Sequence, residues 1–286
     1  MRHPLASLLM LVAALCILPA AAGAQPLAIY DPFDGNGIDA TKWRGTESAS
    51  SLTIVSTDAH RGIVDDRLRL ALTTHGTASS DTGLAGEARN RVLLNHAELA
   101  DGTPAITVMR SNIIMVRAVA QDCAASDVST TTLAGMFGSF FNDGTATPNP
   151  SDFTGDVLAV IDLRRDSRSG RTINAALARC TNSSCSQANI LTSAVFAKSW
   201  SNGEAVTVTI RWQPGQNRFS FVATSAAGSE TKLLTYALSD SDPAKSFLKD
   251  LRVNNAIPHC ATPVRAAVDA RFNNMAINAT AVDAID

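Results

Sequence analysis

Strict two-residue alternation over residues 204–224, EAVTVTIRWQPGQNRFSFVAT, constrains the fold of this chain more than any other feature. Apolar side chains occupy every second position in both halves of the stretch: Val206, Val208, Ile210, Trp212, Phe219, Phe221 and Ala223. A side-chain period of two belongs to extended strands that bury one face and expose the other. Pro214 and Gly215 lie between the halves and favour a turn. The stretch therefore predicts an antiparallel β-hairpin.

Segments of the same kind recur along the chain, and turn residues separate them. Leu133–Phe141 and Asp156–Leu163 are apolar on both faces, which predicts strands in the middle of a sheet. One short helix is predicted over Pro243–Lys249, with Asp242 as its N-cap. No internal repeat of the kind that builds a propeller or a solenoid is present. We therefore predict an all-β fold, a two-sheet antiparallel jelly-roll sandwich with one short helix, as a single domain over residues 25–286.

The N-terminal residues have the three parts of a secretory signal peptide. Arg2 is basic, residues 5–18 form an apolar run, and residues 22–24 are a small-residue cleavage site. We expect residues 1–24 to be removed and the mature protein to be secreted or periplasmic. No later stretch has the length and apolar character that a transmembrane span requires.

The charge balance argues against one class of partner. The chain has 24 Lys and Arg against 26 Asp and Glu, and residues 1–24 contain one of these, Arg2. The mature chain therefore has 23 basic against 26 acidic residues and a net charge of −3. A near-neutral surface without blocks of one sign argues against nucleic acid. The sequence does not indicate the oligomeric state.

Four cysteines remain after the predicted leader is removed: Cys123, Cys180, Cys185 and Cys260. An even number in an exported chain indicates two disulfides, for which three pairings are open. We favour Cys180–Cys185, because the four residues between them form a tight turn that joins two predicted strands. Cys123–Cys260 then follows by elimination. A zinc site is the alternative, but C-x4-C without a second close pair or a nearby histidine is poor zinc spacing.

Several segments resemble the concanavalin A-like lectin and glucanase jelly rolls, and in particular a group of exported bacterial laminin G-like proteins of unassigned activity. The segments are YDPFDGNGIDATKW (30–43), GSFFNDG (138–144), GDVLAVIDL (155–163), ARCTNSSC (178–185), the hairpin above and ARFNNMAIN (270–278). The resemblance covers nearly the whole mature chain. It implies a lectin-like sandwich whose first and last strands pair, and it raises the expectation of contact with a glycan.

The resemblance also implies a structural calcium ion where the first and last strands meet. Asp31, Asp34, Asn36 and Asp269 would supply its hard oxygen ligands. The alternative is that these residues form ordinary turns stabilised by their own side chains.

Enzymes of this superfamily imply two kinds of catalytic site. Its glycosidases carry closely spaced carboxylates on one strand. The matching strand here, residues 156–166, has no Glu, and Asp156 and Asp162 lie about 20 Å apart along it. Its polysaccharide lyases use arginine on a concave face, for which Glu87, Arg89 and Arg91 are candidates. Their order departs from the family pattern, and an ordinary salt-bridged strand face is the far commoner explanation.

Non-catalytic sugar binding uses exposed aromatic side chains beside hydrogen-bonding groups. Trp200 lies in a polar stretch, KSWSNGE, and is a candidate, although a core position is the alternative. Asn142 and Asp143 are candidates for the rim of a site, although they also fit a strand-ending turn. We predict a secreted, non-catalytic module that binds a carbohydrate or an envelope surface polymer. A glycoside hydrolase or lyase is the runner-up, and a structural or adhesion module is the third hypothesis.

Overall fold

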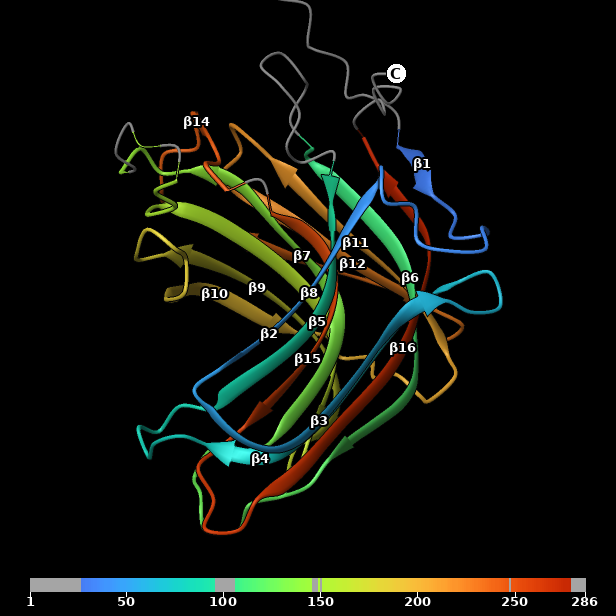
Figure 1. The fold of residues 1–286 in the computed structure, drawn as a ribbon. Helices are drawn as coiled ribbons and strands as arrows, with labels where there is room; N and C mark the ends of the chain where they lie inside the picture. The colour runs from blue at the N-terminus through green and yellow to red at the C-terminus, as the bar shows by residue number, and fades with distance from the viewer. Residues whose placement is uncertain (1–26, 96–105, 146–148, 150, 247, 279–286) are drawn as a thin grey trace, which may run out of the picture.

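The computed structural model describes residues 27–95, 106–145, 149, 151–246 and 248–278, which form sixteen strands. The strands build two eight-stranded sheets in which every ladder is antiparallel. Figure 1 shows the two sheets as curved layers. The predicted all-β, two-sheet jelly-roll sandwich is confirmed. The predicted signal peptide, residues 1–24, lies outside the described residues. Within the described ranges, no helix is long and apolar enough to cross a membrane.

We call the two sheets sheet A and sheet B. Sheet A runs in the order β13 (Gly228–Thr235), β12 (Arg218–Ser225), β11 (Ala205–Gln213), β6 (Val108–Ala120), β16 (Val264–Ile277), β4 (Leu68–Ala78) and β3 (Leu52–Ile63), and β1 (Ala28–Asp31) also pairs with β16. Sheet B runs in the order β10 (Ala188–Val195), β9 (Gly170–Cys180), β8 (Asp156–Asp166), β7 (Thr131–Asn142), β15 (Lys249–Ile257), β5 (Gly86–Leu94) and β2 (Trp43–Ser50), and β14 (Asp242–Pro243) also pairs with β7.

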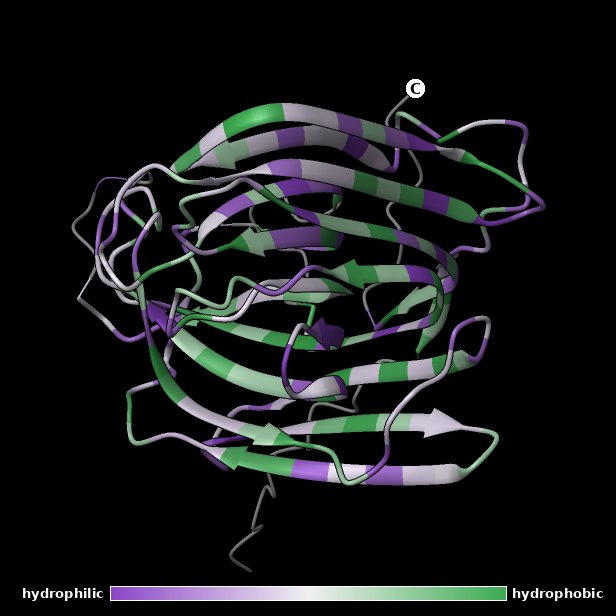
Figure 2. Cartoon of the chain, turned by 90° about the horizontal axis from the view of Figure 1, so that it is seen from below, coloured by the Kyte–Doolittle hydropathy of each residue, from purple (hydrophilic) through white to green (hydrophobic). Residues whose placement is uncertain are grey.

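The core lies between the sheets and follows the alternation of the sequence, which Figure 2 shows along the strands. The β11–β12 hairpin forms as predicted, with Trp212 opposite Phe219. On the facing sheet, Phe141 stacks on Trp212 with ring centroids 5.3 Å apart. The predicted mid-sheet strands are also confirmed, because β7 and β8 each have a neighbour on both sides. Burial of aromatic rings of this kind stabilises the fold by about 1.5–3 kcal/mol per side chain.

The predicted helix over Pro243–Lys249 is wrong, and the described part of the chain contains no α-helix. Asp242 and Pro243 instead form β14, and Lys249 begins β15. The cause is a tertiary contact. The backbone N–H groups of Lys245 and Ser246 donate to the carboxylate of Asp156 over 2.9 and 2.6 Å. A buried carboxylate of β8 thus binds the backbone of residues 245 and 246, and the pairing of Asp242 with Asn142 and of Pro243 with Phe141 on β7 holds the start of the segment extended.

Both predicted disulfides are present. Cys180 and Cys185, with Cα atoms 4.9 Å apart, close the β9–β10 hairpin. Cys123 and Cys260, with Cα atoms 6.1 Å apart, join the β6–β7 connection to the β15–β16 connection. The second bridge spans 137 residues and therefore restricts the unfolded chain far more than the first, which spans 5.

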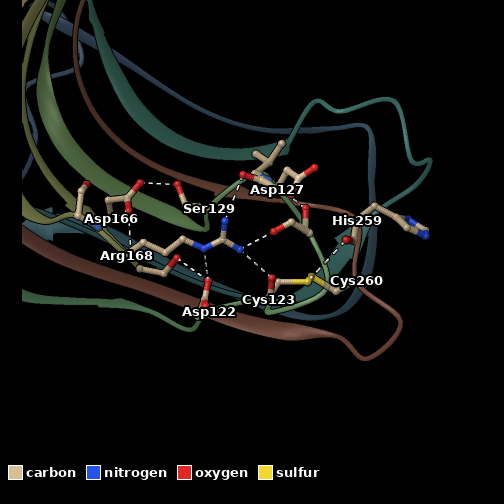
Figure 3. A network of polar contacts seen from close by, with 12 residues as sticks. Asp122, Cys123, Asp127, Ser129, Asp166, Arg168, His259 and Cys260 are labelled. Atoms are coloured by element: carbon tan, nitrogen blue, oxygen red, sulfur yellow. Dashed lines mark hydrogen bonds and ion pairs between the residues drawn. A yellow bond between two sulfur atoms is a disulfide. The ribbon is translucent and has the colours of Figure 1, made fainter.

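Arg168 fastens the same end of the sandwich (Figure 3). Arg168 lies in the turn between β8 and β9. Its guanidinium donates to the backbone carbonyls of Cys123, Ser126 and Asp127 and to the carboxylate of Asp122. These bonds use the guanidinium donors in a fork geometry that a lysine lacks. The β6–β7 connection is therefore held at one point by a disulfide and at several others by one arginine.

Candidate functional site

Sheet B has one face against sheet A and a second face that points away from it, which we call the outer face of sheet B. Strand β15 illustrates the division. Leu251 and Val253 belong to the core between the sheets. Because side chains alternate along a strand, Asp250, Arg252 and Asn254 point to the outer face. All three are nevertheless nearly inaccessible to solvent, with 0%, 8% and 7% of their surface exposed. Buried charged and amide groups on an outer face mark it as the candidate site.

Strand register assembles this site from residues that are distant in the chain. One row of directly paired residues crosses six strands from β9 to β2 and consists of Asn174, Asp162, Gly135, Arg252, Arg91 and Thr46. The row has no space for a side chain at Gly135, because a Cβ atom there would lie 2.5 Å from the carbonyl oxygen of Ile161 and 2.8 Å from the Cβ of Asp162. The row therefore places polar residues of β15, β5 and β2 on one side of β7 and polar residues of β8 and β9 on the other.

Asp250 lies between two arginines. The Nε of Arg252 is 2.7 Å from Asp250 Oδ1, and Nη1 of Arg91 is 3.3 Å from Asp250 Oδ2. The Arg252 guanidinium also lies over the ring of Phe137, 3.9 Å from its centroid. Burial lowers the pKa of Arg91, and the nearby Arg252 and Arg89 lower it further, although Asp250 acts in the opposite direction. Two cations on one buried carboxylate leave this half of the site electropositive.

A second polar group lies across β7, on β8 and β9. The Arg164 guanidinium contacts Asp162 over 3.0 Å, and Asn174 Nδ2 donates to the same carboxylate over 3.3 Å. Asp162 raises the pKa of Arg164, burial opposes it, and Asp166 and Glu87 add to the rise. Glu87 lies on β5, so the acids that raise the pKa of Arg164 come from both sides of β7.

Two buried atoms at the centre of the face have no hydrogen-bond partner. Arg89 and Asn254 are directly paired across β5 and β15. Arg89 uses Nη2 to bind Glu87 on its own strand, but Arg89 Nε and Asn254 Oδ1 are both unpartnered. One atom is a donor and the other an acceptor. Each such buried group costs about 1–3 kcal/mol when it is left unsatisfied. A group that both donates and accepts, as a hydroxyl does, would satisfy the pair.

The other half of the outer face is apolar. Phe137 on β7 pairs with Val160 on β8, which pairs with Ala176 on β9. In the next row, Leu158 pairs with Ala178. Phe137, Val160 and the two alanines are partly exposed. Because alanine side chains are short, they project little above the backbone of the sheet. The outer face of sheet B is thus apolar around Phe137 and the Leu158–Val160 part of β8 with its partners on β9, and it is polar over the other part of β8 and β9 and over β15 and β5.

The predicted lyase candidates lie in this site. Glu87, Arg89 and Arg91 share the outer face of sheet B, as their spacing predicts. Glu87 is paired with Arg89, and Arg91 donates to Thr46 over 2.9 Å in addition to Asp250. The salt-bridged strand face that the sequence suggested for these three residues is therefore part of the polar site.

The other predicted ligand residues lie elsewhere. Trp200 is 2% exposed, and its indole N–H donates to the carbonyls of Arg164 and Thr172, so its ring is part of the core. Asn142, at the end of β7, is buried and donates to Asp156 over 2.8 Å. Asp143 follows it and binds Arg179. Burial raises the pKa of Asp143, but hydrogen bonds from Arg179 and Thr145 outweigh this effect and leave the pKa below its usual value.

The four predicted calcium ligands do not come together. Asp31 is buried and accepts from the Phe33 N–H over 2.8 Å and from the Trp43 indole N–H over 2.7 Å. Asp269 forms a two-pronged pair with Arg69. Asp34 and Asn36 lie in the exposed segment after β1. In the ranges that the structure describes, no three Asp, Glu, His or Cys side chains are grouped so that they could hold a metal ion.

Three central site residues were missed by the sequence analysis: Asp250, Arg252 and Asn254. The reason is that Lys249–Ile257 was not predicted as a strand, because five of its nine residues have charged or carboxamide side chains that usually face solvent. A weak signal is present, since Leu251, Val253 and Ile257 lie at alternate positions. The neighbours that bury the polar residues come from strands more than a hundred residues away.

No family model matches the sequence, and no curated protein matches it. Solved structures that resemble the fold include a seed lectin isoform from Lotus tetragonolobus, at 11% identity and TM-score 0.35 over 84% of this chain and 98% of the lectin. The metal-free carbohydrate recognition domain of Emp46p matches at 10% identity and TM-score 0.36, over 82% and 88%. The CBM2 module of the evolved Dit of Lactobacillus casei BL23 phage J-1 matches at 11% and 0.39, over 85% and 94%. At these identities and TM-scores, the resemblances carry no argument about what this chain binds.

Proposed function

We propose that this protein is a secreted, non-catalytic module that binds a carbohydrate or a related hydroxyl-rich surface polymer on the outer face of sheet B. In this proposal, residues 25–286 form a single sandwich domain behind a cleaved signal peptide. The observation that carries the proposal is the unpartnered pair of Arg89 Nε and Asn254 Oδ1. A sugar hydroxyl both donates and accepts hydrogen bonds, so the hydroxyls of a ligand would satisfy both atoms once the side chains of Arg89 and Asn254 turn to admit it.

The division of the face into two halves supports the same class of ligand. A sugar ring has an apolar face of C–H groups and a rim of hydroxyls. Phe137, Val160 and Ala176 offer a partly exposed apolar surface for the C–H face. Asp250 and Arg252 lie directly beside it and are held in place by their own ion pair. Side chains that are already fixed lose little conformational entropy when a ligand binds.

Polysaccharide cleavage is the alternative, and the acids of the site give it little support. Glycoside hydrolysis needs two carboxyl groups about 5–10 Å apart. Asp162 and Asp250 lie two strands and one row apart, which places their backbones about 12 Å from each other. Each carboxylate also faces its own arginine: Asp162 contacts Arg164, and Asp250 contacts Arg252. The pairing of acids that hydrolysis requires is not built by these two residues.

A glycan array with the full-length mature protein tests the proposal, and calorimetry then measures the affinity for the best ligand. We expect Asn254→Ala to weaken binding by about tenfold or more, because it removes the acceptor of the unpartnered pair. Arg89→Lys keeps the charge but removes Nε–H, and we expect a similar loss. Thr209→Ala, on the outer face of sheet A, is the matched control and should leave binding unchanged.

Three outcomes separate the hypotheses. Binding that falls in both site variants and not in the control supports the module. Release of new reducing ends or of unsaturated sugars by the wild type would establish an enzyme in its place. Absence of binding to every glycan and polymer on the array would favour a structural or adhesion module and reject the proposal.

A further inference from the structure

The outer face of sheet A, which points away from sheet B, carries most of the basic charge of the strands of that sheet. Core residues alternate along these strands with residues that point outward, so the register shows which charges lie on this face. They are seven arginines and two aspartates: Arg69, Arg110, Arg117, Arg211, Arg218, Arg265, Arg271, Asp58 and Asp269. Seven minus two gives the face a charge of +5, although the predicted mature chain has a net charge of −3.

Three of these arginines form a diagonal row across neighbouring strands. Arg110 on β6 pairs with Thr209 on β11, which lies two residues before Arg211. Arg211 in turn pairs with Ser220 on β12, which lies two residues after Arg218. Diagonal neighbours of this kind are about 7–8 Å apart, within reach of long side chains. The arginine row therefore places three like charges along about 15 Å of the outer face.

No acid neutralises the arginine row. The outward-facing residues of β6, β11, β12 and β13 include neither aspartate nor glutamate. Among the residues that the structure describes, none is a carboxylate partner of Arg110, Arg211 or Arg218. Arg218 donates instead to the neutral side chain of Gln213 over 2.7 Å. Unpaired cations at this spacing create a positive potential that attracts an anionic partner.

Exposed aliphatic side chains flank the arginine row. Ile29 on β1 is 50% exposed and lies in the cross-strand row of Arg110, because both residues pair with Ala276 of β16. Leu233 on β13 is 56% exposed and lies in the cross-strand row of Arg211. The phenylalanine, tyrosine and tryptophan side chains on the described strands of sheet A all belong to the core. Aliphatic groups beside arginines fit the headgroup region of a bilayer, whereas single-stranded nucleic acid is bound with exposed aromatic side chains.

We propose that the outer face of sheet A docks on an anionic lipid surface, with the arginine row among the lipid phosphates and with Ile29 and Leu233 between the headgroups. The guanidinium fork matches the oxygens of a phosphate group two at a time. Each arginine close to an anionic bilayer strengthens binding roughly fivefold. An acidic polysaccharide would engage the arginines but would leave the two aliphatic side chains without a partner.

Docking in this orientation turns the outer face of sheet B away from the lipid surface, because the two outer faces lie on opposite sides of the sandwich. The carbohydrate site proposed above would then remain accessible to a glycan. The docking face shares no residue with that site, so the two proposals are independent of each other.

Co-sedimentation of the mature protein with lipid vesicles tests the docking face. We expect binding to phosphatidylcholine vesicles in which about a third of the lipid is phosphatidylglycerol, and little binding to pure phosphatidylcholine. Salt at about 1 M should release the protein, because it screens the charges. The double variant Arg110→Gln/Arg211→Gln should weaken binding by about tenfold or more. Leu233→Ser should weaken it severalfold, because an aliphatic contact is lost.

Lys42→Gln/Lys245→Gln is the matched control, since it removes the same charge from residues outside the strands of sheet A. We expect it to bind the vesicles nearly as the wild type does, and far-UV circular dichroism confirms that every variant folds. Asn254→Ala, in the carbohydrate site, should also leave vesicle binding unchanged.

Four outcomes would overturn the docking face. They are a wild type that stays in the supernatant at every lipid concentration, equal binding to the two kinds of vesicle, a lysine double variant that loses as much affinity as the arginine double variant, and tighter binding to polygalacturonate or single-stranded DNA than to the vesicles. The last result would assign the arginine row to an acidic polymer.

Discussion

The ammonium nitrogen of Lys249 lies 4.4 Å from the centroid of the Phe140 ring and donates to the backbone carbonyl of Ser139. Both side chains are buried, at 7% and 4% exposure. An aromatic ring and one carbonyl replace the water that a lysine normally has around its charge. This arrangement holds a cation where burial works against it.

The first prediction concerns pH. Burial lowers the pKa of Lys249 to about 7, although Asp156 acts in the opposite direction. The unfolded chain has the ordinary lysine pKa of about 10.5, so between pH 7 and 10.5 the unfolded state binds more protons than the folded state. The contribution of Lys249 to the free energy of unfolding therefore rises with pH across this window. Below pH 7, both states are protonated and the full penalty is present.

Lys249→Met isolates this contribution. We expect its stability advantage over the wild type to be larger at pH 7 than at pH 10, by roughly 3 kcal/mol. Urea unfolding of both proteins at the two pH values measures the difference. An advantage that is independent of pH would show that the Lys249 ammonium is adequately solvated in the folded state.

The second prediction compares the two disulfides. The loop-entropy model assigns about 5 kcal/mol to the bridge between Cys123 and Cys260 and about 2 kcal/mol to the bridge between Cys180 and Cys185. We expect the double alanine variant of the long bridge to lose correspondingly more free energy of unfolding in denaturant titrations. Equal losses from the two double variants would contradict this order.

The third prediction concerns Gly135 in the middle of the site. A methyl group there would meet the Ile161 carbonyl at 2.5 Å, which is backbone and cannot move aside locally. We expect Gly135→Ala to lower the free energy of unfolding by about 1–3 kcal/mol. It should also weaken ligand binding, because Asp162 must shift. Gly37→Ala, where nothing lies within 4 Å of the added methyl, is the control and should change neither quantity.

The fourth prediction separates core from ligand platform. Trp200→Phe removes the indole N–H that donates to two backbone carbonyls. We expect it to lower the free energy of unfolding by about 1–2 kcal/mol and to leave glycan affinity unchanged. Thermal unfolding and calorimetry measure the two effects. A loss of affinity without a loss of stability would return Trp200 to the ligand site.

Much of the fold could be predicted locally. The alternation of Val206, Val208 and Ile210 specifies a strand with one buried face, because a one-residue shift would turn all three toward solvent. The short spacing of Cys180 and Cys185 within a hairpin specified one disulfide, and the even number of cysteines then left one partner for Cys123. These features depend on neighbours within a few residues of each other.

The candidate site could be predicted only in part. Glu87, Arg89 and Arg91 were placed on one face by their spacing, but their partners were not. Asp250 and Asn254 belong to a strand whose polar residues are buried by β5 and β7, and nothing in the local sequence signals that burial. The same limit explains why Trp200 was a candidate for the ligand site. Its sequence neighbours are polar and suggested exposure, but other strands cover its ring.

The sequence by itself determined which residues of the predicted strands face inward, because side chains alternate along any strand whatever its neighbours are, and it favoured the cysteine pairing that the structure shows. Only the tertiary structure decided that Asp242 and Pro243 form β14 and that Lys249 begins β15, because pairing with β7 holds both segments extended where a helix would coil. Only the tertiary structure placed Arg89 opposite Asn254 and left β10 at an edge without charges. Both depend on the order of strands in sheet B, and that order results from packing the whole core at once.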